Sequence, residues 1–288
     1  MAPPLLVTGA TGVVGGALIR LFAQSGRRVR ALVRDEVNAR RLSSLADPFI
    51  GDLTVPETLP PAFEGAERVF VLCGPPASRE EMAANAFTAA QWGGARHIVY
   101  LSAFGAETLA GAHWGGHRTN EALLATLGVD WTVLRPTRFM THTPFAWAPV
   151  LEKSLLLEAG GDGLITTVDP ADVAAVAFRT LTEDGHEGKV HELTSEDQYT
   201  VEDFARMIAQ VVGRDVTLFE GSVSEMKQAL ISAGVPSDHA PVILHYFETV
   251  AAGNWRVTPT VAEILGRSPR RYAEWLPANL PPVRALMP

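Results

Sequence analysis

Leu5-Leu6-Val7-Thr8-Gly9-Ala10-Thr11-Gly12-Val13-Val14-Gly15 is the stretch that decides the fold. A short apolar run ends in three glycines, and apolar residues at helical spacing follow at once, at Ala17, Leu18, Leu21 and Phe22. This order predicts a strand, a tight turn and the start of a helix. Such a turn lets backbone N–H groups and the positive end of the helix dipole meet a pyrophosphate. We therefore predict a dinucleotide site here, with a purely structural turn as the alternative.

Each of the three glycines has its own expected role. Gly9 permits the sharp turn, and Gly12 lets the backbone approach the phosphates with no Cβ in the way. Gly15 lets the helix pack closely on the strand. The residues expected to contact the cofactor along this turn are Gly9, Thr11, Gly12, Val13, Val14 and Gly15.

The composition disfavours several classes of protein. The 288 residues carry a formal net charge of −8 and no basic stripe, so we expect no direct nucleic-acid binding. No stretch approaches the ~20 uninterrupted apolar residues of a membrane span, and the first residues lack the pattern of a signal peptide. The single cysteine, Cys73, cannot form an internal disulfide. These features together favour a cytoplasmic protein with no membrane partner.

The end of the second predicted strand, Arg28–Val33, determines which cofactor fits. An acidic side chain there binds the adenosine ribose of NAD, whereas an arginine pairs with the 2′-phosphate of NADP. The sequence places Arg34 first and Asp35 next, with Arg40 and Arg41 a turn further on. Because a guanidinium forms strong charge-assisted bonds with phosphate, we predict NADP(H) with Arg34 as its ligand. NAD, bound through Asp35, is the alternative, and Arg34 would then be a solvated strand end.

Strand and helix patterns then alternate along the chain. Further strands are predicted at Phe49–Leu53, Val69–Gly74, His97–Leu101 and Trp131–Pro136, with helices at Glu80–Trp92 and Gly116–Leu127. Repeated alternation implies right-handed crossovers and a doubly wound parallel sheet of the α/β class. In such a sheet, ligands bind at the carboxyl ends of the strands.

Residues at those carboxyl ends are further candidates for the site. Asp52 follows the third strand and is predicted to face the adenine, with a turn cap as the alternative. Cys73 and Gly74 end the fourth strand where the cofactor ribose would lie. The thiol itself is expected to pack, because no histidine or basic residue adjoins it in the sequence. Ser102 follows the fifth strand and is predicted to contact the substrate or the nicotinamide.

The chain becomes aromatic after the sixth strand. Phe139, Met140, His142, Phe145 and Trp147 follow one another within nine residues. A loop at this place is a natural wall for a flat apolar substrate, and packing in a core is the alternative.

We predict two domains, an NAD(P)-binding domain over residues 1–150 and a smaller, mostly helical subdomain over residues 151–288. A helix starting near Asp169 and a strand at Val190–Leu193 indicate that a segment near 164–195 returns to the sheet. Amphipathic helices with short links fill the remainder, a pattern that favours a lid over the cleft of the sheet. They are predicted at Val201–Val212, Ser224–Ala233, Pro241–Ala252, Thr260–Leu265 and Pro269–Trp275.

These motifs resemble the NmrA-like branch of the atypical short-chain dehydrogenases/reductases, over most of the chain. The resemblance rests on Thr8-Gly9-Ala10-Thr11-Gly12-x-x-Gly15, Arg34, Gly51-Asp52, Leu101-Ser102-Ala103, the helix with His117 and Glu121, Leu134-Arg135-Pro136, and Leu265-Gly266-Arg267-x-Pro269. It implies a Rossmann-type sheet of strand order 3-2-1-4-5-6, a small C-terminal subdomain and a preference for NADP. The family includes reductases of quinones, azo dyes and other aromatics. It also includes redox sensors that bind the cofactor without turning it over.

This sequence lacks the Tyr-x-x-x-Lys pair of the short-chain reductases that act on alcohols and carbonyls. In that pair, the lysine lowers the tyrosine pKa so that the phenol can protonate a carbonyl oxygen. No lysine precedes Lys153, and Tyr100, the only tyrosine before Tyr199, is followed four residues later by Phe104.

His113 and His117 stand at the aligned helix positions, and three interpretations of them are open. In the first, the histidines contact the substrate or act as acid or base, because imidazole titrates near neutrality. In the second, they bind a metal, which we do not expect, because neither a third ligand nor a His-Glu-x-x-His pattern is evident. In the third, they are solvated or packed residues at a helix start that Gly115 and Gly116 weaken.

The leading hypothesis is an NADPH-dependent reductase that transfers a hydride to a quinone-like or conjugated aromatic small molecule. Such an acceptor needs no dedicated proton donor, because its reduced anion is delocalised and can wait for water. Tailoring of an aromatic natural product would fit the range of the family. The alternative is a non-catalytic NADP(H) sensor that acts through a protein partner or a homo-oligomer. A sugar-nucleotide epimerase or dehydratase is disfavoured, because those reactions rely on the same missing tyrosine.

Overall fold

The computed structural model describes residues 4–74, 78–142, 152–237 and 239–279, without the side chains of Ala112 and His113. The chain divides into two compact units. The first comprises Met1–Pro136, Pro170–Leu193 and Thr260–Arg267, and the second Thr137–Asp169, Thr194–Pro259 and Ser268–Pro288. The first segment of this unit ends at residue 136, whereas the predicted boundary is residue 150. The unit also contains residues 260–267, which were predicted to belong to the smaller subdomain.

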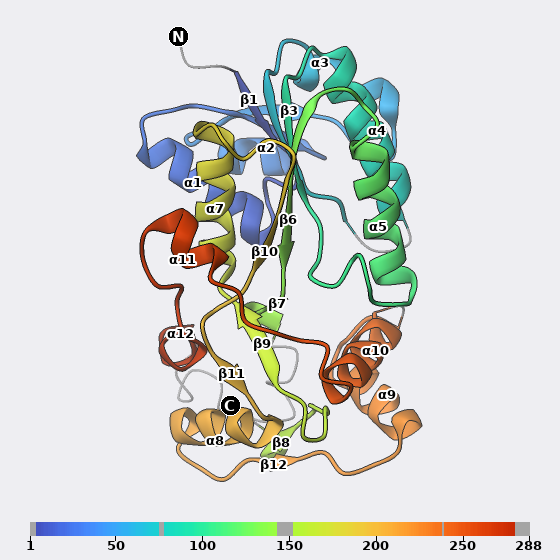
Figure 1. Ribbon diagram of the computed structural model, residues 1–288, viewed down its shortest axis with the longest axis vertical. Helices are drawn as coiled ribbons and strands as arrows, with labels where there is room; N and C mark the ends of the chain where they lie inside the picture. Colours follow the sequence, from blue (N-terminus) through green and yellow to red (C-terminus); the bar gives the residue numbers. More distant parts are fainter. Residues whose placement is uncertain (1–3, 75–77, 143–151, 238, 280–288) are drawn as a thin grey trace. The chain divides into compact units, whose positions relative to one another are not determined.

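A seven-stranded parallel sheet forms the centre of the first unit, in the order β10-β6-β5-β4-β1-β2-β3 (Figure 1). The predicted order 3-2-1-4-5-6 is thereby confirmed, and β10 adds a seventh strand beside β6. The strand β1 is apolar throughout, and β4 and β5 are apolar or aromatic after their first residue, because a parallel sheet is covered on both faces. The strands are β1 (Leu5–Val7), β2 (Arg30–Val33), β3 (Asp47–Ile50), β4 (Arg68–Val71), β5 (His97–Leu101), β6 (Asp130–Pro136) and β10 (Lys189–Leu193).

Helices cover both faces of this sheet. On one face lie α1 (Val13–Gln24), α7 (Pro170–Thr182) and α11 (Thr260–Leu265), and on the other lie α4 (Arg79–Trp92) and α5 (Ala112–Leu124) (Figure 1). Phe22 of α1 packs on Phe178 of α7 with ring centroids 4.9 Å apart. The shorter α2 (Glu36–Leu42), the 3₁₀ turn η1 (Pro56–Thr58) and α3 (Pro60–Phe63) complete the unit.

Two helices of the first unit differ from their predictions. α5 begins at Ala112 instead of Gly116, because Trp114 is buried and its indole Nε1 donates a 2.9 Å hydrogen bond to the Phe104 carbonyl. Tertiary packing thus outweighs the low helix propensity of the two glycines. α11, predicted as part of the lid, packs on α7 with Val261 fully buried. Its return to the first unit is invisible in a pattern of helices read along the chain.

The second unit is mostly helical, with two small sheets. Its helices are α8 (Val201–Val212), α9 (Val223–Ser232), α10 (Ala240–Ala251) and α12 (Tyr272–Asn279). One sheet has the order β11 (Gln198–Tyr199), β9 (Ile165–Val168), β7 (Arg138–Phe139), and the other pairs β12 (Thr217–Leu218) with β8 (Leu155–Leu156). Most of these strands have only two residues, too few for an alternating pattern to reveal them.

The start of α1 generates a stability prediction. A Cβ on Gly15 would lie 2.2 Å from the Gly9 carbonyl oxygen, whereas one on the adjacent Gly16 would meet the Ala10 oxygen at 3.5 Å, an ordinary contact. We expect Gly15→Ala to lower the free energy of unfolding by about 2 kcal/mol through overpacking. Gly16→Ala should raise it by roughly 0.5 kcal/mol through helix propensity. Urea denaturation measures both, and equal effects would contradict the close approach at Gly15.

Candidate cofactor and substrate site

The turn between β1 and α1 leaves an open backbone cradle. Gly9 has φ +61°, and Gly15 lies against its carbonyl, so the helix starts directly over the turn. Gly12 is the N-cap of α1, and no side chain caps the helix or places an acid in its first turn. Thr11, Gly12 and Val13 are exposed. Since the first N–H groups of a helix have no partner within it, this end offers several donors and a positive dipole to an anion.

These features fit the pyrophosphate of a dinucleotide. A Cβ on Gly12 would have the Gly9 oxygen at 3.2 Å as its nearest neighbour and would otherwise point into open space, where a bound phosphate would lie. The side chain of Val14 is buried, so a cofactor contact from this residue would come from its backbone. The contacts of the individual turn residues with a cofactor stay predictions.

Arg34 and Asp35, the residues predicted to discriminate between NADP and NAD, differ in the bonds that their side chains form. The Asp35 carboxylate caps α2 by accepting 2.8 Å bonds from the backbone N–H and the side-chain amide of Asn38. The backbone bond from Asn38 is the main reason that the pKa of Asp35 is lowered. Arg34 is exposed and forms no ion pair with any residue in the described ranges. The acid is thus occupied in capping, while the guanidinium is available for a phosphate.

The residues after β3 and β4 are also engaged locally. The Asp52 carboxylate accepts 2.8 Å bonds from the backbone N–H and the hydroxyl of Thr54, which lower its pKa. The turn cap considered for Asp52 is therefore present, and contact with adenine stays a prediction. Cys73 packs against the apolar core, and burial raises the pKa of its thiol to about 12, so the thiol is neutral at ordinary pH. Any contact of Cys73 or Gly74 with a ribose stays a prediction too.

The face of α5 that meets β5 carries a first row of hydrogen bonds. Tyr100 points to this face, and its hydroxyl lies 2.8 Å from His117 Nδ1 and accepts a 2.9 Å bond from the Asn120 amide. Burial strongly raises the pKa of Tyr100, so the phenol stays neutral. His117 is buried, and the side chain of His113 lies outside the described part of the chain. The acid–base or substrate role of either histidine stays a prediction.

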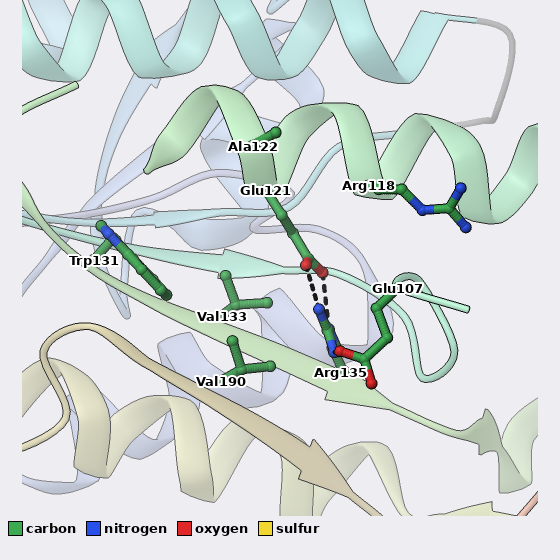
Figure 2. Close-up of a pocket in the computed structure, with 8 residues that line it drawn as sticks. All are labelled: Glu107, Arg118, Glu121, Ala122, Trp131, Val133, Arg135 and Val190. Carbon is green, nitrogen blue, oxygen red and sulfur yellow. Dashed lines mark hydrogen bonds and ion pairs between the residues drawn. The ribbon is translucent and has the colours of Figure 1, made fainter. Parts of the chain in front are cut away.

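A second row of hydrogen bonds starts at Ser102, two residues further along the chain and on the same face as Tyr100. The Ser102 hydroxyl donates to the Glu121 carboxylate. Arg135 of β6 holds that carboxylate with two bonds, of 3.0 Å from Nε and 2.6 Å from Nη2, and binds Glu107 at 2.6 Å (Figure 2). Burial acts to lower the Arg135 pKa, but its bonds to Glu121 and Glu107 outweigh burial and raise it.

Four residues of these two rows were not predicted as site residues from the sequence. Glu121 and Arg135 were noted only as positions of a family motif, and Asn120 and Glu107 were not noted. The available signal was spacing: residues 117, 120 and 121 lie on one helix face, and residues 100 and 102 on one strand face. What no spacing reveals is that these two faces meet.

A surface cavity of about 320 Å³ lies next to the ion pairs of Arg135. Trp131 and Val133, which share a strand face with Arg135, and Val190 of the neighbouring β10 form its apolar wall (Figure 2). None of the predicted cofactor or substrate residues lines it.

The predicted substrate residues belong to the second unit. Phe139 is partly buried, with its ring centroid 5.3 Å from that of His142, and Met140 is fully buried, as packing in a core requires. His142 itself is exposed. Phe145 and Trp147 lie outside the described residues. The role of all five in substrate binding stays a prediction.

Two other kinds of site are absent from the described residues. None of the helices there is both long and apolar enough to span a bilayer. The described residues also contain no group of three or more His, Cys, Asp or Glu side chains arranged to hold a metal ion.

Comparison with known proteins places these features in context. A family profile described as NAD(P)H-binding matches residues 9–184. An NAD(P)H azoreductase of Xenophilus azovorans is 30% identical over 283 residues, which are 96% of this chain and 97% of that protein. The NADPH-dependent quinone oxidoreductase QOR2 of Escherichia coli, solved with NADPH, superposes with a TM-score of 0.88 at 27% identity, covering 94% of this chain and 98% of that one. The triphenylmethane reductase of a Citrobacter species, solved with NADP(H), gives 0.86 at 26% identity, with 96% and 100% covered.

The open cradle generates a binding prediction. Gly12 has an extended backbone, φ −78° and ψ 178°, that any residue adopts, so Gly12→Val should fold. Its methyl groups would occupy the space predicted for the pyrophosphate. We expect NADPH affinity to fall at least tenfold, since several charge-assisted bonds of about 1.5–3 kcal/mol each are lost. Titration calorimetry measures the loss, circular dichroism checks the fold, and Gly16→Ala is the control that should bind normally.

Proposed function

The chain belongs to the NAD(P)H-binding family, in the NmrA-like branch of the atypical short-chain dehydrogenases/reductases, and from that premise we propose that it is an NADPH-dependent reductase of a quinone-like or conjugated aromatic small molecule. The names of the similar proteins support this class, because azo compounds, quinones and triphenylmethane dyes are all conjugated acceptors.

The observation that carries the proposal is the state of Tyr100. It is the only tyrosine of the first unit, and the sequence contains no Tyr-x-x-x-Lys. Its hydroxyl is buried and hydrogen-bonded to two side chains of α5, and its raised pKa makes the phenol a weaker acid than an ordinary tyrosine. No ammonium group adjoins it in the sequence. Tyr100 therefore does not replace the missing phenol–lysine pair as a proton donor.

This loss selects the kind of acceptor. When bound, NADPH supplies a hydride, and the protein contributes position and electrostatics. A reduced ketone oxygen is strongly basic and needs a proton at once, which this site does not supply through a phenol. A reduced quinone spreads its charge over the ring and takes its proton from water, so that quinone, NADPH and a proton give hydroquinone and NADP⁺.

Finer features complete the proposal. Within the second unit, the partly buried Phe139 is the proposed contact of a flat substrate. Within the first unit, His117 and Ser102 are the proposed ligand contacts. The substrate is an aromatic natural-product intermediate, and the protein acts in the cytoplasm, as its single cysteine favours.

A comparison of acceptors tests the function. We expect NADPH oxidation, followed by its absorbance, to depend on added quinone, with kcat/KM at least about 100-fold above that for a matched aryl ketone, the factor that a general acid contributes. Tight NADPH binding without turnover on any quinone would contradict a reductase. It would favour the sensor hypothesis, in which the two redox forms of the cofactor bind with different affinities.

A single arginine tests the cofactor preference. Arg34→Ala should weaken NADPH binding by about 10- to 100-fold, the value of a charge-assisted phosphate contact, and leave NADH binding nearly unchanged. Arg96→Ala is a matched control, because it removes the same charge from an exposed site just before β5. This site lies at the amino ends of the strands, away from the carboxyl ends where the cofactor is expected. Calorimetry with both nucleotides measures the effect, and equal losses for NADPH and NADH would contradict the assignment of Arg34.

A further inference from the structure

The hydrogen-bond direction at Ser102 is set before any ligand arrives. We propose, on the basis of the reductase function above, that Ser102 faces its ligand only as a hydrogen-bond acceptor, so that the ligand group docked there must donate an N–H or O–H. The proposal concerns which chemistry this position recognises, and it follows from the side chains behind it.

The single hydrogen of the Ser102 hydroxyl is already used. Serine has one O–H donor and two acceptor lone pairs. The hydrogen goes to Glu121, whose carboxylate can only accept. The Ser102 backbone N–H is used as well, in a 2.8 Å bond to the Leu134 carbonyl. What Ser102 can still offer to a ligand is a lone pair on its hydroxyl oxygen.

The partner of Ser102 cannot readily turn away. Arg135 binds both oxygens of Glu121, and its side chain is 7% exposed, against 12% for that of Glu121 (Figure 2). A bidentate guanidinium–carboxylate pair of this kind is short and geometrically specific. Glu107 holds the remaining end of the guanidinium. If Ser102 rotated its hydrogen toward a ligand, Glu121 Oε1 would keep its 3.0 Å bond from Arg135 Nε but lose the hydroxyl donor, at about the cost of one hydrogen bond to a charged group.

This direction restricts the ligand. A carbonyl oxygen, or an oxygen gaining negative charge, needs a donor and finds none in Ser102. Two ligand groups offer the required hydrogen: the carboxamide N–H₂ of the nicotinamide and a phenolic O–H of the substrate or product. The two share one chemistry and can be separated by choosing probes that lack the hydrogen.

The first arm of the test uses the cofactor. NADP⁺ and its 3-acetylpyridine analogue differ in replacing the carboxamide N–H₂ by a methyl group. If the carboxamide docks at Ser102, the analogue should bind about three- to tenfold more weakly to the unmodified protein, the worth of one hydrogen bond. Ser102→Ala should remove the difference, and Ser102→Thr, which keeps a hydroxyl, should retain it. Calorimetry measures binding without any turnover.

The second arm uses the substrate side. With NADP⁺ bound, a hydroquinone and its O-methyl ether are compared in the same three proteins. If a phenolic hydroxyl docks at Ser102, the ether should bind about three- to tenfold more weakly, and Ser102→Ala should again abolish the difference.

Two carboxyl variants separate the direction of the bond from mere contact. Glu121→Gln has one acceptor oxygen in place of two, and when that oxygen takes the Arg135 Nη2 bond its amide N–H₂ faces Ser102 and frees the serine hydrogen, so the discrimination found in either arm should fall. Glu107→Gln is the matched control, because Glu107 binds the same arginine without contacting Ser102, and the discrimination should persist.

The proposal is overturned if Ser102→Ala leaves the discrimination of both arms unchanged, if neither arm discriminates, or if Glu121→Gln and Glu107→Gln act alike. Because every measurement is of binding, a protein that discriminates as expected but reduces no quinone would overturn the reductase function alone.

Discussion

The rest of the structure depends on the contact between the first turn of α1 and the carbonyl of Gly9. A helix can start this close to its strand only where one residue has no side chain, since a Cβ on Gly15 would lie 2.2 Å from that oxygen. The contact directs the open end of α1 to the carboxyl edge of the sheet, where β1 lies between β4 and β2. Residues that follow β2, β3, β4 and β5 lie at the same carboxyl end of the sheet, where ligands bind in folds of this class.

A second organising feature is the register between β5 and α5. Tyr100 and Ser102 alternate onto the same strand face, and α5 meets them with His117, Asn120 and Glu121. The same face that removes Tyr100 from acid–base chemistry also fixes the hydrogen of Ser102. Both effects disfavour an acceptor whose oxygen needs a hydrogen at the moment of reduction, and both favour one that spreads its charge. In the proposed reductase, residues behind the site would thus largely decide the substrate class.

The sequence was sufficient for features that repeat or that follow from backbone sterics. The glycine turn and helix α8 were predicted from periodicity and spacing, the order of six strands was implied by the family resemblance, and all are present. Features that depend on distant partners were not predictable. The bond from Arg135 to Glu121 joins a strand to a helix, the two-residue strands carry no period, and α11 returns to a unit that the chain had left. Asp35 is a different case, because its cap of α2 uses Asn38 only three residues later and is a local signal that was not considered for this residue.

The uncapped start of α1 has a thermodynamic consequence. A serine or aspartate at this N-cap would stabilise the fold by roughly a few tenths of a kcal/mol more than Gly12 does, and Gly12 leaves the first amides of the helix without a side-chain partner. The missing stabilisation is recovered only when an anion arrives. By mass action, a ligand present at 100 times its dissociation constant stabilises the folded state by about 2.7 kcal/mol. The lifetime of this protein in a cell would therefore follow the size of the nicotinamide nucleotide pool, whether or not a substrate is present.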